Sequence, residues 1–114
     1  MPTTVLTRTR TKPIPNGMRT HRRKFIFPIL EALNNLGGSA TTSQVLSEVE
    51  NLMRGTLNRV DYQHLNSRPT EIRWRNTSRW TKDAMIGLGL IASNSPRGVW
   101  EITDLGYDFL SLTR

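Results

Sequence analysis

The chain has 114 residues, the length of one small domain, and its 36% of hydrophobic residues is enough for one modest core. It contains no cysteine, which excludes disulfides, thiolate nucleophiles and cysteine-ligated metals, and no apolar run is long enough to cross a bilayer. Together with a formal net charge of +7, these features predict a cytoplasmic, nucleoid-associated protein with a polyanionic partner.

Positive charge is concentrated in two separated regions. Residues 1–24 hold seven basic side chains and no acid, so the remainder of the chain is balanced, with nine basic and nine acidic groups. Within that remainder, residues 68–82 carry five basic side chains against Glu71 alone. This clustering favours nucleic acid as the partner, because charge that only keeps a protein soluble does not need to be clustered.

Residues 1–23 are predicted to form a flexible basic arm. Pro13 and Pro15 oppose a helix there, and Asn16-Gly17 is a turn pair. The side chains of this arm that are candidates for a minor-groove contact are Arg8, Arg10 and Lys12. A disordered, solubilising tail explains the same residues equally well.

Apolar residues at three- and four-residue spacings predict a first helix over about residues 23–36, which Gly37-Gly38 ends. A short extended piece is predicted to follow. Thr41 and Gln44 have the spacing of a capping box, so a second helix is predicted to begin there and to end near Gly55.

The second half of the chain is predicted to contain a third helix, a hairpin and a last helix. A short helical turn is expected around residues 60–65, and the third helix over about residues 71–88. The two strands of the hairpin are predicted at residues 90–92 and 99–102. Thr103 is a suitable N-cap for the last helix. This order of elements predicts an α+β, mostly helical fold, a winged helix-turn-helix DNA-binding domain over residues 24–114.

The third helix carries basic and aromatic residues that interleave in sequence but separate on a helical wheel. With Arg75 at zero, Arg79 and Lys82 fall within about 40°, whereas Trp80 and Trp74 fall on an apolar arc between roughly 140° and 280°. We therefore expect Trp80 to be buried, with Trp74 at the edge of the same arc. A platform of tryptophans that stack on bases is disfavoured because the wheel separates them from the arginines.

The basic stripe is predicted to contact DNA, with a solvated helix face as the alternative. Arginine can bind guanine through two hydrogen bonds, and Lys82 suits a phosphate. Ile86 also points outward on the wheel, toward a thymine methyl or a protein partner. The full set of predicted DNA-binding residues outside the arm is Arg73, Arg75, Asn76, Ser78, Arg79 and Lys82 on the helix, and Ser95 and Arg97 in the hairpin turn.

Several motifs with consistent spacing resemble one known family, the N-terminal domain of Mrr-type restriction proteins. These motifs are Leu36-Gly37-Gly38, Trp80 followed by Gly89-Leu90-Ile91, the stretch SPRGVW over residues 95–100, and TDLG over residues 103–106. The resemblance covers about residues 25–107. It implies a winged-helix DNA-binding module, which in full-length Mrr-like proteins is usually joined to a nuclease that cleaves modified DNA.

No catalytic activity is predicted for this chain. Its acids are scattered, and His21 and His64 stand apart, so neither a metal site nor a nucleophile–base pair is expected and no cofactor is implied. Since the sequence ends at Arg114, where the nuclease of the family would begin, we expect a separate nuclease partner or a targeting fragment.

The leading hypothesis is binding of double-stranded DNA, with or without modified bases, in regulation or in defence against foreign DNA. Structured RNA is an alternative polyanion for a small basic protein. A different class of function is a protein-interaction or homodimerisation module, because winged helices also serve as adaptors. That hypothesis would gain if Ile86 and Trp74 were exposed and Arg79 were paired to an acid.

Overall fold

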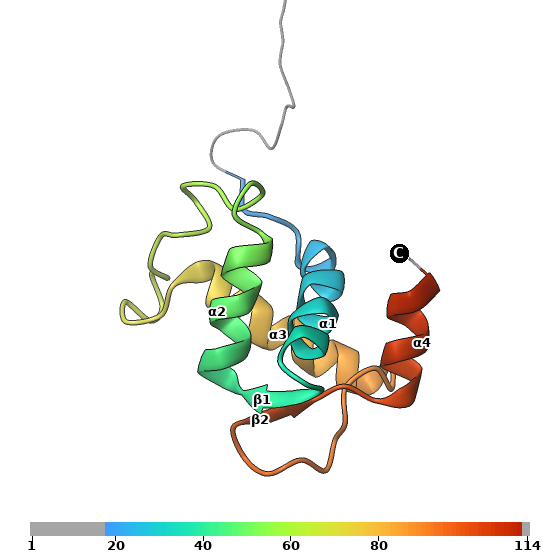
Figure 1. Cartoon of the computed structure of the whole chain (residues 1–114). Coiled ribbons are helices and arrows are strands. Elements are labelled where there is room, and N and C mark those ends of the chain that lie inside the picture. The colour runs from blue at the N-terminus through green and yellow to red at the C-terminus, as the bar shows by residue number, and fades with distance from the viewer. Residues whose placement is uncertain (1–17, 113–114) are drawn as a thin grey trace, which may run out of the picture.

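The computed structural model describes residues 18–112. Four helices and one small antiparallel sheet make up this part of the chain (Figure 1). The elements in order are the 3₁₀ turn η1 (Arg22–Phe25), α1 (Ile26–Asn35), β1 (Ser39–Thr41), α2 (Thr42–Leu52), α3 (Arg73–Gly87), β2 (Val99–Glu101) and α4 (Asp104–Leu112). The α+β, largely helical class predicted from sequence is therefore confirmed.

Local sequence signals set the ends of the first two helices. Pro28 lies in the first turn of α1, where a missing backbone N–H costs no helical hydrogen bond. The helix ends where Gly37 and Gly38 take positive φ values of 94° and 105°, which allows the Gly38 N–H to donate to Leu33 O at 2.7 Å. At the start of α2, the predicted capping box of Thr41 and Gln44 is present in full.

The sheet joins two segments that are far apart in sequence. In β1 and β2, Ser39 pairs with Glu101 and Thr41 with Val99. The strand predicted at residues 90–92 is reduced to one bridge, between Ile91 and Ile102. After Ile91, the loop over residues 93–98 leads the chain to β2, and it lies below the helices in Figure 1.

The long link between α2 and α3 is irregular but well anchored. The helical turn expected at residues 60–65 is a pair of hydrogen-bonded turns instead, with Tyr62 N donating to Arg59 O and Gln63 N to Val60 O. Asp61 is 1% exposed, and its carboxylate accepts hydrogen bonds from the Thr20 N–H at 2.7 Å, the Thr20 hydroxyl at 2.6 Å and the Asn58 N–H at 2.9 Å.

These bonds tie residues 18–20 to the domain. Thr20 is fully buried, and the side-chain amide of Asn58 donates to Met18 O at 3.0 Å. The packed part of the chain therefore begins before the boundary that the sequence suggests at residue 24. Two of the cations from the basic N-terminal region, Arg19 and Arg22, are consequently held beside the helices.

One hydrophobic core lies between the helices and the sheet. Trp74, Phe25, Leu30 and Met85 are among its fully buried side chains, and Trp100 of β2 is also buried in it. At the side of the core, Phe27 of α1 and Phe109 of α4 stack with ring centroids 5.3 Å apart. Helix α3 packs on η1 and α1, so its opposite surface faces solvent.

Candidate nucleic-acid interface

Small hydroxyl side chains form much of the buried face of α3. Thr77, Ser78 and Thr81 are all buried, and their hydroxyls donate to the backbone carbonyls of Arg73, Trp74 and Thr77 at 3.0, 2.9 and 2.7 Å. Each hydroxyl is satisfied within the helix, and that of Thr81 also lies 3.3 Å from the Arg22 carbonyl of η1. These residues can therefore be buried without a side-chain partner from another element. Ser78 thus lies in the interior, and the expectation that it sits beside the exposed basic stripe is wrong.

Of the two tryptophans that the wheel places on the apolar arc of α3, only Trp74 is buried. Trp74 is 1% exposed, whereas Trp80 is 61% exposed, so the predicted burial of Trp80 is wrong. The buried residues of α3 span roughly 200° to 300° on the wheel described above, and Trp80, at about 140°, falls outside that arc. The prediction took the largest apolar side chains as the centre of the buried arc. The face that packs is instead built largely from Thr and Ser, so its centre lies elsewhere on the wheel.

Arg75, Arg79 and Lys82 lie on the flank of α3 that faces α2 and the loop before β2. The guanidinium of Arg75 lies 5.5 Å from the centre of the Trp74 ring, and Lys82 Nζ lies 5.5 Å from that of Trp100. Arg79 forms an ion pair with Glu71, and Lys82 pairs with Asp83 at 3.3 Å. The stripe is therefore present, with two of its three cations already close to an acid.

A cavity of about 310 Å³ lies between this flank and the loop over residues 93–98. Arg79 and Lys82 line it from α3, and Ser95 and Arg97 line it from the loop. The Ser95 hydroxyl donates to Glu101 Oε1 at 3.1 Å, while Arg97 is exposed. Ile86 also lines the cavity and is half-buried against the core, so it does not point freely outward as the wheel suggests.

A second cavity, of about 330 Å³, continues the first toward α2. It is lined by Arg75 and Arg79 of α3 and by polar residues of α2 that sequence reasoning missed, Thr42, Ser43 and Ser47. The two cavities share Thr42 and Arg79, and we call them together the α3 groove. The spacing of Ser43 and Ser47, four residues apart on one helix face, was the available sequence signal for this wall.

Thr42 also fixes the groove's geometry. Its hydroxyl accepts a hydrogen bond from Trp100 Nε1 at 3.0 Å, and its backbone N–H donates to Gly98 O at 3.0 Å. The start of α2, strand β2 and the loop before it are thereby joined at one residue. The loop that carries Arg97 is held at a defined position relative to Arg75, Arg79 and Lys82.

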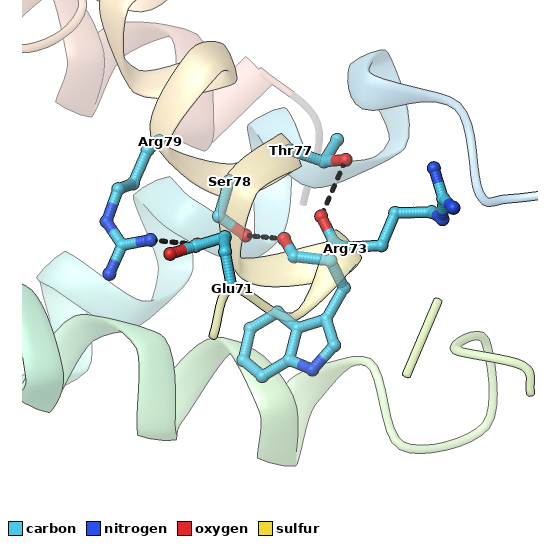
Figure 2. Close-up of polar contacts among 6 residues, drawn as sticks. Glu71, Arg73, Thr77, Ser78 and Arg79 are labelled. Carbon is cyan, nitrogen blue, oxygen red and sulfur yellow. Dashed lines mark hydrogen bonds and ion pairs between the residues drawn. The ribbon is translucent and has the colours of Figure 1, made fainter. Parts of the chain in front are cut away.

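The remaining predicted residues of α3 lie elsewhere. Arg73 and Asn76 line a different cavity, of about 280 Å³, with Trp80. Figure 2 shows Arg73 and Arg79 extending from opposite sides of the helix. We call this cavity the Trp80 pocket; its lining residues are Arg19, Arg22, Leu65, Arg73, Asn76, Thr77 and Trp80. The stripe of Arg75, Arg79 and Lys82 thus stays on one flank, whereas Arg73 and Asn76 of the predicted DNA-binding set line a separate site.

The predicted minor-groove residues of the arm, Arg8, Arg10 and Lys12, lie outside the part of the chain that the structure describes. Among residues 18–112, no three His, Asp or Glu side chains come close enough to hold a metal ion. In the same part of the chain, no helix combines the length and apolar character needed to cross a membrane.

A model of the Mrr N-terminal domain matches residues 23–111. The match takes in both strands and all of the helical elements except Arg22 of η1 and Leu112 of α4. No curated protein and no solved structure matches the chain. The matched span agrees with the resemblance seen in the motifs between Leu36 and Gly106, and the chain belongs to the family of Mrr N-terminal domains.

Proposed function

We propose that this chain is a winged helix-turn-helix module that binds double-stranded DNA through the α3 groove and serves as the target-recognition or regulatory part of a restriction-type system. The observation that carries the proposal is the convergence of four cations, Arg75, Arg79, Lys82 and Arg97, on two adjoining cavities. They come from a helix and from a loop that Thr42 holds in place, and such an arrangement suits a polyanion with two strands.

The order of elements supports the winged-helix assignment. Helix α2 leads through the long link into α3, and the loop over residues 93–98 then leads into β2, which pairs with β1. In winged helix-turn-helix proteins, the helix at the position of α3 enters the major groove and the hairpin loop lies beside it. Ile91, bridged to Ile102, occupies the place of the missing wing strand.

Each cation has a role that follows from its chemistry. The planar guanidinium groups of Arg75 and Arg79 fit two acceptors of a guanine edge. Lys82 and Arg97, on either side of the first cavity, suit phosphates of the backbone. The DNA itself, with or without modified bases, supplies the sequence information, and the chain carries out no bond-breaking step in this scheme.

The test is a binding titration of labelled duplex pools, methylated and unmethylated, at two salt concentrations. The variant Arg75→Ala/Arg79→Ala/Lys82→Ala should bind at least about tenfold more weakly, and the dependence of affinity on salt should become shallower by about 0.9 for each phosphate that the variant no longer neutralises. A charge-matched control carries Lys24→Ala, Arg54→Ala and Arg59→Ala, at exposed positions outside both sites. If the two triple variants bind duplex equally well, the α3 groove is not the interface.

The same titration separates DNA from RNA as the ligand. If the groove is specific for DNA, structured RNA added at equal salt should displace the labelled duplex poorly. The adaptor hypothesis is weakened because Trp74 is buried and Ile86 is half-buried, although Arg79 is paired to an acid as that hypothesis expects. The adaptor hypothesis would be favoured if copies of the chain associate in solution and a variant that abolishes this association still binds DNA.

A further inference from the structure

Trp80 is exposed, whereas Trp74, Met85 and Ile86 of the same helix pack in or against the core. The side chain of Trp80 is 61% exposed and lines the Trp80 pocket. An indole left in water costs free energy that burial would recover. A flat aromatic surface beside cationic groups is the arrangement that proteins use to stack unpaired bases.

Three arginines line the pocket together with this indole. Arg19 and Arg22 reach the pocket from the segment before α1, and Arg73 reaches it from the first turn of α3. Among the described residues, none of these three arginines forms an ion pair, in contrast to Arg79 in the α3 groove. The Nε atom of Arg73 is also buried without a hydrogen-bond partner there. The pocket therefore carries three cations that are in no direct ion pair, and the buried carboxylate beside it, that of Asp61, is bonded to Thr20.

The walls of the pocket are held by buried hydrogen bonds. Thr20, between Arg19 and His21, is fixed by the carboxylate of Asp61. The backbone N–H of Arg73 donates to Gln63 O at 2.8 Å, and the carbonyl of Arg73 accepts from the Thr77 hydroxyl. A site whose backbone is already ordered loses less entropy when a ligand binds.

A larger cavity adjoins the pocket. It has a volume of about 510 Å³ and is lined by Met18, Arg19, His21, Val60, Gln63 and Arg73. Arg19 and Arg73 line both cavities, so the cationic surface continues from Trp80 past Arg73 toward the N-terminal segment. This path gives a strand room to continue from the stacked base toward the N-terminal segment.

We infer that the Trp80 pocket binds a nucleoside phosphate, with the base stacked on the indole of Trp80 and the phosphate held by Arg19, Arg22 and Arg73. The amide of Asn76, on the same wall, can bond to a base edge. Arg73, which lines the site, extends from the opposite side of α3 to Arg79 (Figure 2). The site does not depend on duplex binding by the α3 groove. Its ligand is either a nucleotide within an unpaired strand or a free nucleotide.

The experiment uses three probes and the full chain. These are a single-stranded oligothymidylate, an abasic oligodeoxyribonucleotide with the same number of phosphates, and thymidine monophosphate. Trp74 and Trp100 are buried, so quenching of the exposed tryptophan emission by a probe reports on Trp80. We expect oligothymidylate to quench that emission and the abasic strand to bind about tenfold more weakly, because it lacks the stacking base. Quenching by the monophosphate at similar affinity identifies a free nucleotide, and quenching by the strand alone identifies an unpaired segment.

Variants are compared by anisotropy of the labelled strand. Trp80→Ala should weaken binding about tenfold while Trp80→Phe keeps most of it, since phenylalanine still offers an aromatic face. Trp80 is exposed, so both variants should fold, which circular dichroism checks. Equal binding of the abasic strand and oligothymidylate, or an unchanged affinity in Trp80→Ala, would overturn the inference.

The two proposals fail separately. Arg75→Ala/Arg79→Ala/Lys82→Ala should keep single-strand binding at the Trp80 pocket, and Trp80→Ala should keep duplex binding at the α3 groove. If the first triple variant loses the single strand as well as the duplex, one surface binds both, and a distinct nucleotide site is contradicted.

Discussion

Arg79 and Glu71 form an ion pair (Figure 2). Glu71 lies just before α3 begins, and its side chain is 18% exposed, whereas that of Arg79 is 43% exposed. The pair places an acid against a cation that is otherwise directed into the α3 groove. A polyanion that binds there must compete with Glu71 for Arg79.

We expect Glu71→Gln to strengthen duplex binding several-fold, because it frees the guanidinium and removes one repelling charge. The salt dependence should steepen by about 0.9 if Arg79 then engages a phosphate. The measurement is the same titration at two salt concentrations. Asp108→Asn, an exposed acid on α4, is the charge-matched control, and equal affinity in the two variants would show that the ion pair does not restrain Arg79.

Gly106 should be intolerant of a side chain. A Cβ there would collide with the backbone carbonyl of Leu90 and lie 2.6 Å from Ile102 Cγ1, so α4 would have to move away from these two residues. We expect Gly106→Ala to lower the free energy of unfolding by about 1–3 kcal/mol, measured by urea denaturation. Gly87→Ala, at the end of α3 with nothing near its Cβ, should be neutral or slightly stabilising. Similar losses in both variants would contradict this explanation.

The carboxylate of Asp61 should be essential for holding the N-terminal segment. In Asp61→Asn, an NH₂ group replaces one carboxylate oxygen. This donor would face the donor groups of Thr20 or Asn58 that bond to the carboxylate in the parent. The expected loss is about 1–3 kcal/mol, with faster proteolysis near residues 18–25. In a double-mutant cycle with Thr20→Val, the two losses should not add, because they remove the same bond. Additive losses would mean that the bond contributes little.

Tyr62 should show the clearest response to high pH. Burial raises the pKa of Tyr62 above its ordinary value, and the hydrogen bond that its hydroxyl donates to Glu50 at 2.9 Å raises it further. The neutral phenol is therefore favoured in the folded state. The resulting stability is fully present below the unfolded pKa of about 10 and is lost as pH rises from there through the folded pKa.

The measurement is the ultraviolet titration of tyrosinate, assigned with Tyr62→Phe. In Glu50→Gln the negative charge is gone, so the pKa of Tyr62 should fall back toward 10. The stability of Tyr62→Phe should also decline less between about pH 10 and the folded pKa than that of the parent. An unchanged tyrosinate titration in Glu50→Gln would rule out the carboxylate as a cause.

Features set by neighbouring residues could be predicted from the sequence. The capping box of Thr41 and Gln44 and the N-cap of Thr103, whose hydroxyl accepts from the Gly106 N–H at 3.0 Å, are present as expected. In both cases the two partners are three residues apart. Such bonds depend on little beyond the local sequence.

Features that depend on distant contacts could not be predicted in this way. The burial of Ser78 and the exposure of Trp80 depend on which face of α3 meets η1 and α1, and side-chain hydrophobicity alone indicated a different face. The bond between Thr20 and Asp61 joins residues 41 apart. Nothing in the sequence near either residue indicates the other, so the placement of Arg19 beside α3 was missed as well.

The hydroxyl-rich inner face of α3 has a consequence for how such a protein can diversify. Thr77, Ser78 and Thr81 bond to carbonyls of their own helix, so the inner face needs no side-chain partner that would have to change in step with the outer one. Positions such as Arg75, Arg79 and Trp80 can therefore be exchanged for other residues at little cost in folding. The same scaffold can therefore present a different chemical surface on this side of α3.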